Sequence, residues 1–326
     1  MAEISYREAL NQALREEMDR DERVFIMGEE VGYFGGAFKV TDGLLAVYGE
    51  KRVRDTPISE LTIVGAGVGA AMGGLRPIVE LMTVNFGLLA MDQIVNHAAK
   101  IRYMFGGKAK VPLVIRTPQG AGHQLGAQHS QSLEAYFLHC PGVRVAIPAT
   151  PADAKGLLKS ALRQDDPVVF LEHESLYSVK GEVPDGEIVD TLGSAKIVRP
   201  GKDATILALA LMVPRALAAA EKLKNEHGID CEVVDVRSLV PLDTQSILGS
   251  VARTHRLFTV EENPRLCGWG AEIVSIVADE AFYDLDGPPV RITTPHIPLP
   301  AADILEDIAL PTVDRIAERV RKSLES

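Results

Sequence analysis

The order of apolar and polar residues constrains the fold of this chain more than any other feature. Five apolar runs of four to six residues occur in the first half, separated by stretches with helical periodicity: VFIM (24–27), PIVELM (77–82), VPLVIR (111–116), VRVAIP (143–148) and PVVFLE (167–172). Short apolar strands that alternate with helices are typical of a parallel sheet covered on both faces. We therefore expect a doubly wound α/β domain in the first half.

The same alternation resumes in the second half, after a break in the pattern. Residues 174–187 are polar and rich in glycine and proline, and VRPGKD (198–203) marks a further break. Beyond it we expect helices at 212–226 and after Gly270, and strands at ATILALA (204–210), CEVVDV (231–236), RLFTVEE (256–262) and PVRITTP (289–295). The sequence predicts two α/β domains, residues 1–187 and a smaller one at 188–326.

Two helices have clear sequence signals. Ser5 and Glu8 form a capping box, and apolar residues then recur at helical spacing up to Met18. Residues 86–105 read as one long helix ended by Gly106 and Gly107.

Charge and composition narrow the classes of partner. The 326 residues include 45 acidic and 34 basic ones, a net charge of −11, and no run of Lys and Arg suits a phosphate backbone. The amino terminus lacks a basic region followed by an apolar one, and no segment approaches the ~18 apolar residues of a membrane span. The three cysteines are far apart and offer neither a disulfide framework nor a metal clip. We expect a soluble cytoplasmic protein that binds no nucleic acid or membrane.

The stretch GAGVGA (65–70) matches the glycine pattern of dinucleotide-binding folds, but its surroundings do not. A buried strand should precede the pattern and an acidic residue should follow about 20 positions on. A charged segment precedes it instead, and Asn85 stands at the later position. We expect a helix that begins near Glu60 and carries Gly65, Gly69 and Gly73 on one stripe. Such a stripe permits close packing, either within the core or at a subunit interface.

Two side chains stand out as candidates for chemistry. Glu60 lies at the start of a predicted helix, where the pattern alone favours a glutamate stabilised by the helix dipole. His129 follows a strand in a glycine-rich loop, a place where active sites of open α/β sheets occur. From the pattern alone it reads as a loop hydrogen-bonder, because His123 and Cys140 do not stand at metal-ligand spacing from it.

Several longer segments resemble the beta subunits of 2-oxo acid dehydrogenase complexes, most closely those of the pyruvate dehydrogenase type, which belong to the transketolase-like thiamine diphosphate enzymes. The resemblance runs nearly end to end and rests on GEEVGYFGGAFKVTDGL (28–44), DTPISE (55–60), GLRPIVELMTVNF (74–86), GAQHSQ (126–131), HCPGVRV (139–145), DAKGLLKSALR (153–163) and EVVDVRSLVPLD (232–243). It implies a thiamine-pyrimidine-binding domain with a mostly parallel sheet, followed by a smaller transketolase C-terminal-like domain.

The resemblance also implies roles for individual residues. Glu60 would hydrogen-bond a pyrimidine nitrogen of thiamine diphosphate and so activate the cofactor, and Met82 and Phe86 would hold the pyrimidine ring. His129 would line the active-site channel, where it could stabilise a developing alkoxide or assist acyl transfer. Some family members bind a potassium ion through backbone oxygens, which correspond here to those of Leu113, Ala161, Leu162, Gln164 and Asp166. The segment RQDDP (163–167) departs from the usual residues at the last two positions.

One expected motif is absent. Thiamine diphosphate enzymes hold the diphosphate and its magnesium with a G-D-G sequence, and this chain has none. The family pattern therefore implies a separate alpha subunit that carries magnesium, in an α₂β₂ heterotetramer. The expected reaction is oxidative decarboxylation of pyruvate with acyl transfer to lipoyl groups of the acyltransferase component. An acetoin or branched-chain 2-oxo acid enzyme is an alternative, because YMFGGKAK (103–110) also resembles acetoin dehydrogenases. A noncatalytic docking scaffold is a remoter one.

Overall fold

A computed structural model of the chain describes residues 1–325. The chain divides into two compact units. The first contains residues 1–119 and 136–192, and the second contains residues 120–135 and those from 193 onward. The sequence-based boundary between residues 187 and 188 stays a prediction.

The first unit is built on a parallel sheet. Its strands lie in the order β6 (Arg144–Ala146), β7 (Val168–His173), β5 (Val114–Gln119), β4 (Arg76–Glu80), β2 (Val24–Gly28) and β3 (Val53–Asp55). Each neighbouring pair is parallel. Every residue of β2, β4, β5 and β7 is buried, as strands covered on both faces require. The doubly wound α/β prediction is confirmed for this unit.

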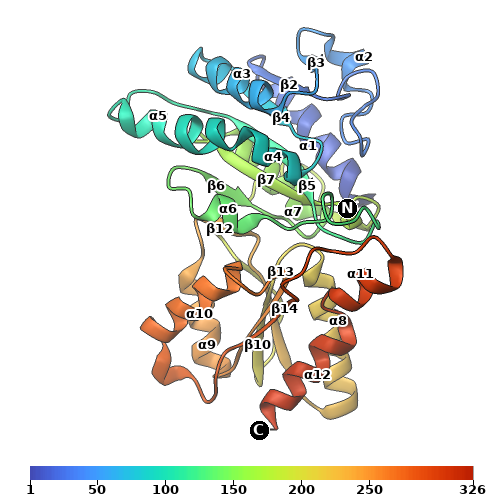
Figure 1. Ribbon diagram of the computed structural model, residues 1–326, viewed down its shortest axis with the longest axis vertical. Helices are drawn as coiled ribbons and strands as arrows, with labels where there is room; N and C mark the ends of the chain where they lie inside the picture. Colours follow the sequence, from blue (N-terminus) through green and yellow to red (C-terminus); the bar gives the residue numbers. More distant parts are fainter. Residues whose placement is uncertain (326) are drawn as a thin grey trace. The chain divides into compact units, whose positions relative to one another are not determined.

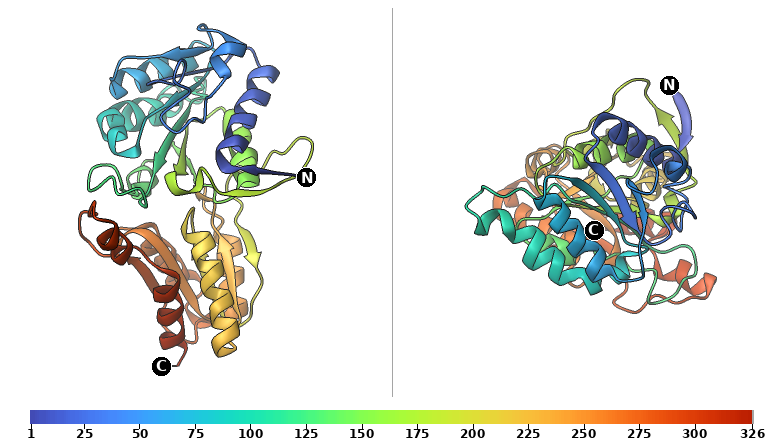
Figure 2. Two further views of the ribbon diagram at one scale, coloured as in Figure 1. Left: turned by 90° about the vertical axis from the view of Figure 1, so that its right-hand side faces the viewer. Right: turned by 90° about the horizontal axis from the view of Figure 1, so that it is seen from above.

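The amino-terminal helix begins where its capping box places it. The Ser5 hydroxyl accepts the Glu8 N–H, and the Glu8 carboxylate accepts the Ser5 N–H, at the start of α1 (Tyr6–Arg20). Helix α7 (Pro151–Leu162) is capped by the Thr150 side chain and lies beside α1 (Figure 2). The other elements are β1 (Ala2–Ser5), which pairs antiparallel with β8 (Lys180–Val183), the short helix α2 (Leu44–Tyr48) and η3 (Glu174–Leu176). Helix α6 (Glu134–Leu138) begins in the segment that groups with the second unit.

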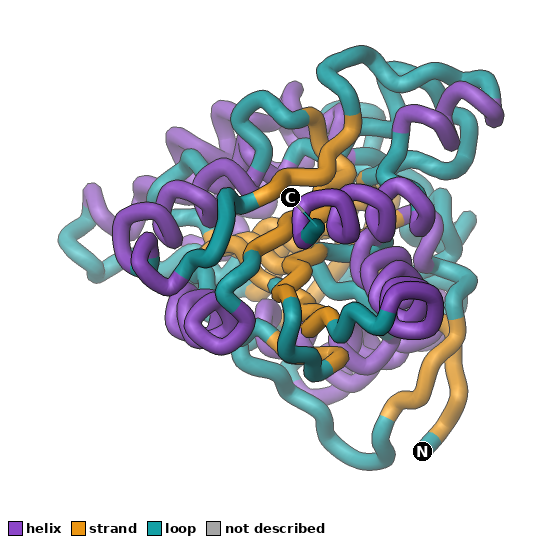
Figure 3. The backbone as a smooth tube through the Cα atoms, turned by 90° about the horizontal axis from the view of Figure 1, so that it is seen from below, coloured by secondary structure: helices purple, strands orange, loops and turns teal. Residues whose placement is uncertain are grey.

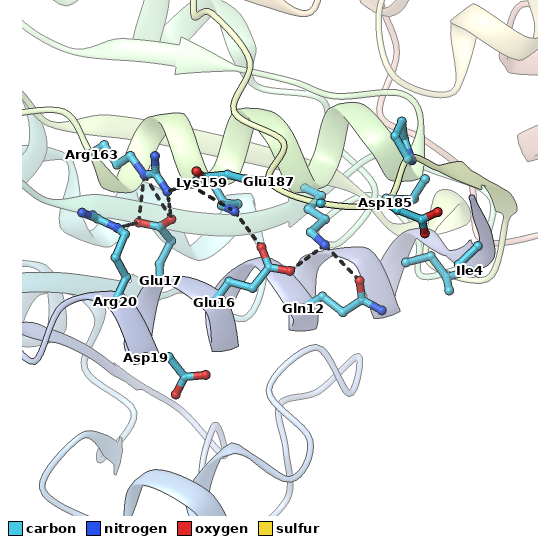
Figure 4. Close-up of a pocket in the computed structure, with 15 residues that line it drawn as sticks. Ile4, Gln12, Glu16, Glu17, Asp19, Arg20, Lys159, Arg163, Asp185 and Glu187 are labelled. Carbon is cyan, nitrogen blue, oxygen red and sulfur yellow. Dashed lines mark hydrogen bonds and ion pairs between the residues drawn. The ribbon is translucent and has the colours of Figure 1, made fainter.

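Ion pairs connect α1 to α7 (Figure 4). Lys155 and Lys159 each place Nζ 2.6 Å from the Glu16 carboxylate, and Arg163 pairs with Glu17 at 2.7 Å. The Glu17 side chain is fully buried, and it also accepts from Arg20 at 2.8 Å. Separating α1 from α7 would leave the buried Glu17 carboxylate without Arg163, and an uncompensated buried charge is costly. The ion pairs therefore favour this position of α1 on α7.

The predicted helix at 86–105 is helical throughout but not uniform. Helical structure runs from Val84 to Met104, through α4 (Val84–Gly87), the 3₁₀ turn η1 (Leu88–Ala90), the π-helical η2 (Gln93–Ala98) and α5 (Ala99–Met104). The prediction of one regular helix is wrong in this respect. Changes from i+3 to i+5 hydrogen bonding alter the pitch, and an apolar pattern read at 3.6 residues per turn does not detect them.

Helix α3 (Glu60–Met72) begins at the predicted residue and lies on the same face of the sheet as η2 (Figure 1). Its buried side contains Gly67, where an added Cβ would stand 2.7 Å from Val79 Cγ1. Gly69 and Gly73 are exposed, and an added Cβ on Gly69 would have nothing within 4 Å. The prediction that the glycine stripe packs within the core is therefore wrong for Gly69. That the stripe lies at a subunit interface stays a prediction.

The second unit also has a mostly parallel sheet. Its strand order is β14 (Val290–Thr294), β13 (Leu257–Pro264), β10 (Ala204–Ala208), β11 (Cys231–Asp235) and β9 (Lys196–Arg199), with only β9 antiparallel to its neighbour among the described residues. Figure 3 shows helices on either side of these strands. Its other elements are α8 (Met212–His227), β12 (Ser238–Val240), α9 (Thr244–Thr254), α10 (Trp269–Glu280), η4 (Phe282–Asp284), α11 (Asp303–Ala309) and α12 (Val313–Leu324). The expected second α/β fold is confirmed. Across residues 1–325, no helix has both the length and the apolar character needed to cross a membrane.

Candidate active site

The strand order of the first unit reverses at β2. The chain passes from β2 to β3 on one side of β2 and returns to β4 on its other side. Ligands of open α/β sheets bind at such a reversal, beyond the carboxyl ends of the strands. Glu29 follows β2, Glu60 follows β3 at the start of α3, and Met82 and Phe86 follow β4. The three residues predicted for the pyrimidine thus lie at one edge of the sheet.

Glu60 is a buried carboxyl group. It is 4% exposed, and its negative charge acts on the nearby carboxyl group of Glu29. Ser59, the N-cap residue, provides no side-chain cap, so the glutamate stands at an uncapped helix start. The helix dipole explains a negative charge at this position but not its burial, because a buried carboxylate is costly unless it is hydrogen-bonded. The site therefore fits a ligand that offers a hydrogen-bond donor, as the pyrimidine nitrogen of thiamine diphosphate does when it shares a proton.

Glu29 is a second buried carboxyl group, which the sequence did not single out. It is 6% exposed, and its Oε1 atom has no hydrogen-bond partner in the described part of the chain. Burial raises the pKa of Glu29, and the nearby negative charge of Glu60 raises it further. The segment GEEV (28–31) directly after a buried strand was the available signal. Because the negative charges of Glu29 and Glu60 repel each other, protonation of one of the two carboxyl groups is favoured.

Met82 lies just after β4, and Phe86 lies in the short helix α4 that follows. Both are half-buried, so each side chain keeps part of its surface accessible. The Phe86 N–H donates to the Thr83 carbonyl at 3.1 Å, and the Leu81 N–H donates to the Arg116 carbonyl at 3.0 Å. The second of these bonds holds the end of β4 against β5. A half-buried aromatic ring suits stacking on a flat ring.

A cluster of buried charged residues lies on the strands that precede this segment and neighbour it in the sheet. The Arg116 guanidinium donates to both oxygens of Glu172 at 2.6 Å and also to Glu80, and the Tyr177 hydroxyl donates to Glu172 at 2.7 Å. Burial raises the pKa of Glu80, which Arg116 opposes. The sequence signal for this cluster was the presence of charged residues within the buried strands β4, β5 and β7. The apolar pattern of those strands concealed it. The cluster joins β4, β5 and β7 to one another through Glu80, Arg116 and Glu172.

His129 belongs to the other unit. The loop 120–135 groups with the second unit, whereas Glu60, Met82 and Phe86 belong to the first. The His129 N–H donates to the Gly126 carbonyl at 3.2 Å, which closes a turn around the histidine. Its side chain is half-buried.

Four of the five backbone oxygens predicted to bind potassium already accept hydrogen bonds. Arg76 donates to the Leu162 carbonyl at 2.9 Å and to the Gln164 carbonyl, so a guanidinium supplies positive charge there. The Leu113 carbonyl accepts the Val168 N–H at 2.9 Å, the Ala161 carbonyl accepts the Gln164 N–H at 3.2 Å, and the Asp166 carboxylate pairs with Arg102. This arrangement does not fit an open carbonyl cage. We derive no step from potassium, and its binding stays a prediction.

Comparison with known proteins covers nearly the whole chain. Residues 2–180 match the family described as "Transketolase, pyrimidine binding domain", and residues 193–316 match "Transketolase, C-terminal domain". The "Pyruvate dehydrogenase E1 component subunit beta" of Rickettsia felis is 50% identical over 320 residues, which cover 98% of each chain. The mitochondrial protein with the corresponding name in Bos taurus is 47% identical over 327 residues, 99% of this chain and 91% of that one.

A solved structure shares the fold. The protein described as "Split gene transketolase, inactive beta4 tetramer" superimposes with a TM-score of 0.80 at 24% identity, over 99% of this chain and 98% of that one. With the two domain matches and the near full-length identity, the chain belongs to the family of pyruvate dehydrogenase E1 beta subunits, in which a transketolase-type pyrimidine-binding domain precedes a transketolase-type C-terminal domain.

Proposed function

We propose that this chain is the beta subunit of a thiamine diphosphate-dependent pyruvate dehydrogenase and contributes the pyrimidine half of the cofactor site. The observation that carries the proposal is Glu60, a carboxylate that is 4% exposed and stands at an uncapped helix start near the buried Glu29. It lies where the strand order of the sheet reverses, in a chain whose first domain matches the transketolase pyrimidine-binding domain. The fold alone would not assign this role, because one fold supports many functions.

The chain's own residues would act on the cofactor by holding it and by managing one proton. Glu60 accepts a hydrogen bond and shares a proton with a pyrimidine nitrogen, a task that only an acid at this position can perform. Met82 and Phe86 supply the apolar surface against the ring. When bound, thiamine diphosphate supplies the carbon nucleophile that makes decarboxylation of a 2-oxo acid feasible.

The remaining half of the site would come from an alpha subunit. The chain lacks a G-D-G sequence for the diphosphate and magnesium. We propose an α₂β₂ heterotetramer, with the diphosphate and magnesium held by the alpha subunit, and with the exposed Gly69 stripe of α3 as one surface between subunits.

We further propose that the acyl unit passes to a lipoyl group of the acyltransferase component, with His129 on the channel wall. An imidazole titrates near neutral pH, so it can donate a proton to a developing alkoxide or to a departing sulfur.

The experiment is reconstitution with the chain's own alpha subunit, thiamine diphosphate and magnesium. Turnover of pyruvate, 3-methyl-2-oxobutanoate and acetoin is measured side by side, as decarboxylation of the two 2-oxo acids and as carbon–carbon cleavage of acetoin. We expect the highest kcat/KM for pyruvate. Preference for either other substrate by more than about tenfold, a difference of about 1.4 kcal/mol in transition-state binding, would instead assign the acetoin or branched-chain class. No turnover of any of the three by a complex that binds the cofactor would favour the docking scaffold.

A further inference from the structure

A buried carboxylate, that of Glu262, accepts hydrogen bonds from both ends of the loop 120–135, which carries His129. Glu262, on β13, is 7% exposed. Its Oε1 atom accepts the Ala121 N–H at 2.7 Å and the Ser132 hydroxyl at 3.4 Å. The Gly120 N–H also donates to the Gln131 carbonyl at 3.2 Å. The two ends of the loop are thus drawn together, and a charged acceptor makes these bonds stronger than neutral ones.

A second carboxylate holds the far part of the same loop. Glu306, on α11, is 1% exposed, and its Oε2 atom accepts the Gln124 N–H at 3.2 Å. The Gln124 side chain donates to Asp303 Oδ1 at 2.8 Å. Gln124 has a φ of +54°, a left-handed conformation that costs a non-glycine residue energy and persists only when its surroundings hold it.

Apolar contact completes the fastening. Ala121 packs in one buried cluster with Leu299, Ala309 and Leu310, the residues that flank and end α11. An irregular loop cannot satisfy its own backbone N–H groups, so each buried one needs a partner from elsewhere. Here β13 supplies the partner of the buried Ala121 N–H, and α11 supplies that of the Gln124 N–H, both from positions far along the chain.

We propose that Glu262 and Glu306 are positioning residues, which set the conformation of the loop 120–135 and thereby the location of the His129 imidazole. This inference rests on the proposed function for its catalytic consequence, but the fastening of the loop does not. Neither carboxylate is assigned any contact with substrate or cofactor. Their effect on turnover would pass through His129.

The test uses the complex reconstituted with its own alpha subunit and compares three alanine variants. Glu262→Ala and Glu306→Ala each remove one fastening. Asp307→Ala is the matched control, because Asp307 is exposed on the same helix as Glu306. Glu262→Gln and Glu306→Gln test rescue, since an amide oxygen can still accept an N–H.

The first measurement is hydrogen exchange of peptides that contain the Ala121 and Gln124 amides. We expect exchange at least about tenfold faster in the two alanine variants and unchanged in the control, because each amide loses its acceptor. Equal exchange in wild type and both variants would overturn the fastening, whatever the complex catalyses.

The second measurement is a double-mutant cycle with His129→Ala. Misplacing a catalytic group by about 1 Å can cost about 10²-fold in rate, so we expect kcat to fall by about 10- to 100-fold while KM for the 2-oxo acid stays within about threefold. The glutamine variants should recover most of the loss. In the His129→Ala background the same substitutions should cost less than about twofold. Losses that multiply fully in the double variants would overturn the positioning role. Faster loop exchange in a complex whose wild type turns over no 2-oxo acid would refute the proposed function and support the fastening.

Discussion

The two glycines Gly67 and Gly69 make opposite predictions for the same substitution. Both lie within α3, two residues apart, and each would gain helix propensity of about 1 kcal/mol on replacement by alanine. A Cβ on Gly67 would stand 2.7 Å from Val79 Cγ1 and 3.1 Å from Leu113 Cδ1, and both neighbours are fully buried. A Cβ on Gly69 would meet nothing within 4 Å.

The propensity gain is common to both variants, so their difference in stability isolates the packing cost. Adding a methyl group to a filled core costs about 1 to 3 kcal/mol. We therefore expect the free energy of unfolding of Gly69→Ala to exceed that of Gly67→Ala by about 1 to 3 kcal/mol. The free energy of unfolding of Gly69→Ala should equal or exceed that of the wild type.

The assay is urea unfolding of the purified chain followed by circular dichroism, with the slope m checked for constancy. Equal stability of the two variants would refute the assignment of the buried and exposed faces of α3. The same conclusion would follow if Gly69→Ala were the less stable of the two.

Three further predictions concern assembly, cofactor and cation. Gly69→Leu should leave the purified chain's melting temperature near that of the wild type but shift the complex toward smaller species in sedimentation; an unchanged profile would contradict an interface at this stripe. The chain without its alpha subunit should bind thiamine diphosphate weakly or not at all in calorimetry, because the diphosphate and magnesium half-site is absent, and tight magnesium-dependent binding would contradict the shared site. Arg76→Met should destabilise the fold, because each lost hydrogen bond from a charged donor is worth about 1.5 to 3 kcal/mol. Potassium should then restore part of the melting temperature and lithium should not, since only the larger ion suits freed carbonyl oxygens; equal melting in both salts would contradict a cation site there.

Local sequence patterns were sufficient for the elements but not for their irregularities. The capping box placed the start of α1, and the residues after TPIS marked the start of α3. The apolar runs located most strands of the two parallel sheets but not β3 or β9, which lie at sheet edges. The π-helical turn of η2 was not predicted, because a change of pitch leaves an apolar stripe nearly intact.

The site was predicted only where it depends on local sequence. Glu60 was identified at its helix start, but its burial depends on the packing of the whole unit. The grouping of the His129 loop with the second unit depends on contacts over large separations. Ala121 and Glu262 are 141 residues apart, and Gln124 and Glu306 are 182 apart. Patterns read along the sequence carry no information about such pairs.

The most direct test of the proposed chemistry is Glu60→Gln in the reconstituted complex. Glutamine keeps the size of the side chain and can still hydrogen-bond, but it cannot share a proton with the pyrimidine nitrogen. Loss of one positioned acid or base costs about 10² to 10⁴ in rate, whereas loss of a helix-dipole interaction costs under about 1 kcal/mol of stability and no activity. We expect pyruvate turnover to fall by that factor while the melting temperature and the sedimentation profile stay near those of the wild type. Turnover close to the wild-type rate would contradict the role of Glu60 and with it the assignment of the pyrimidine site.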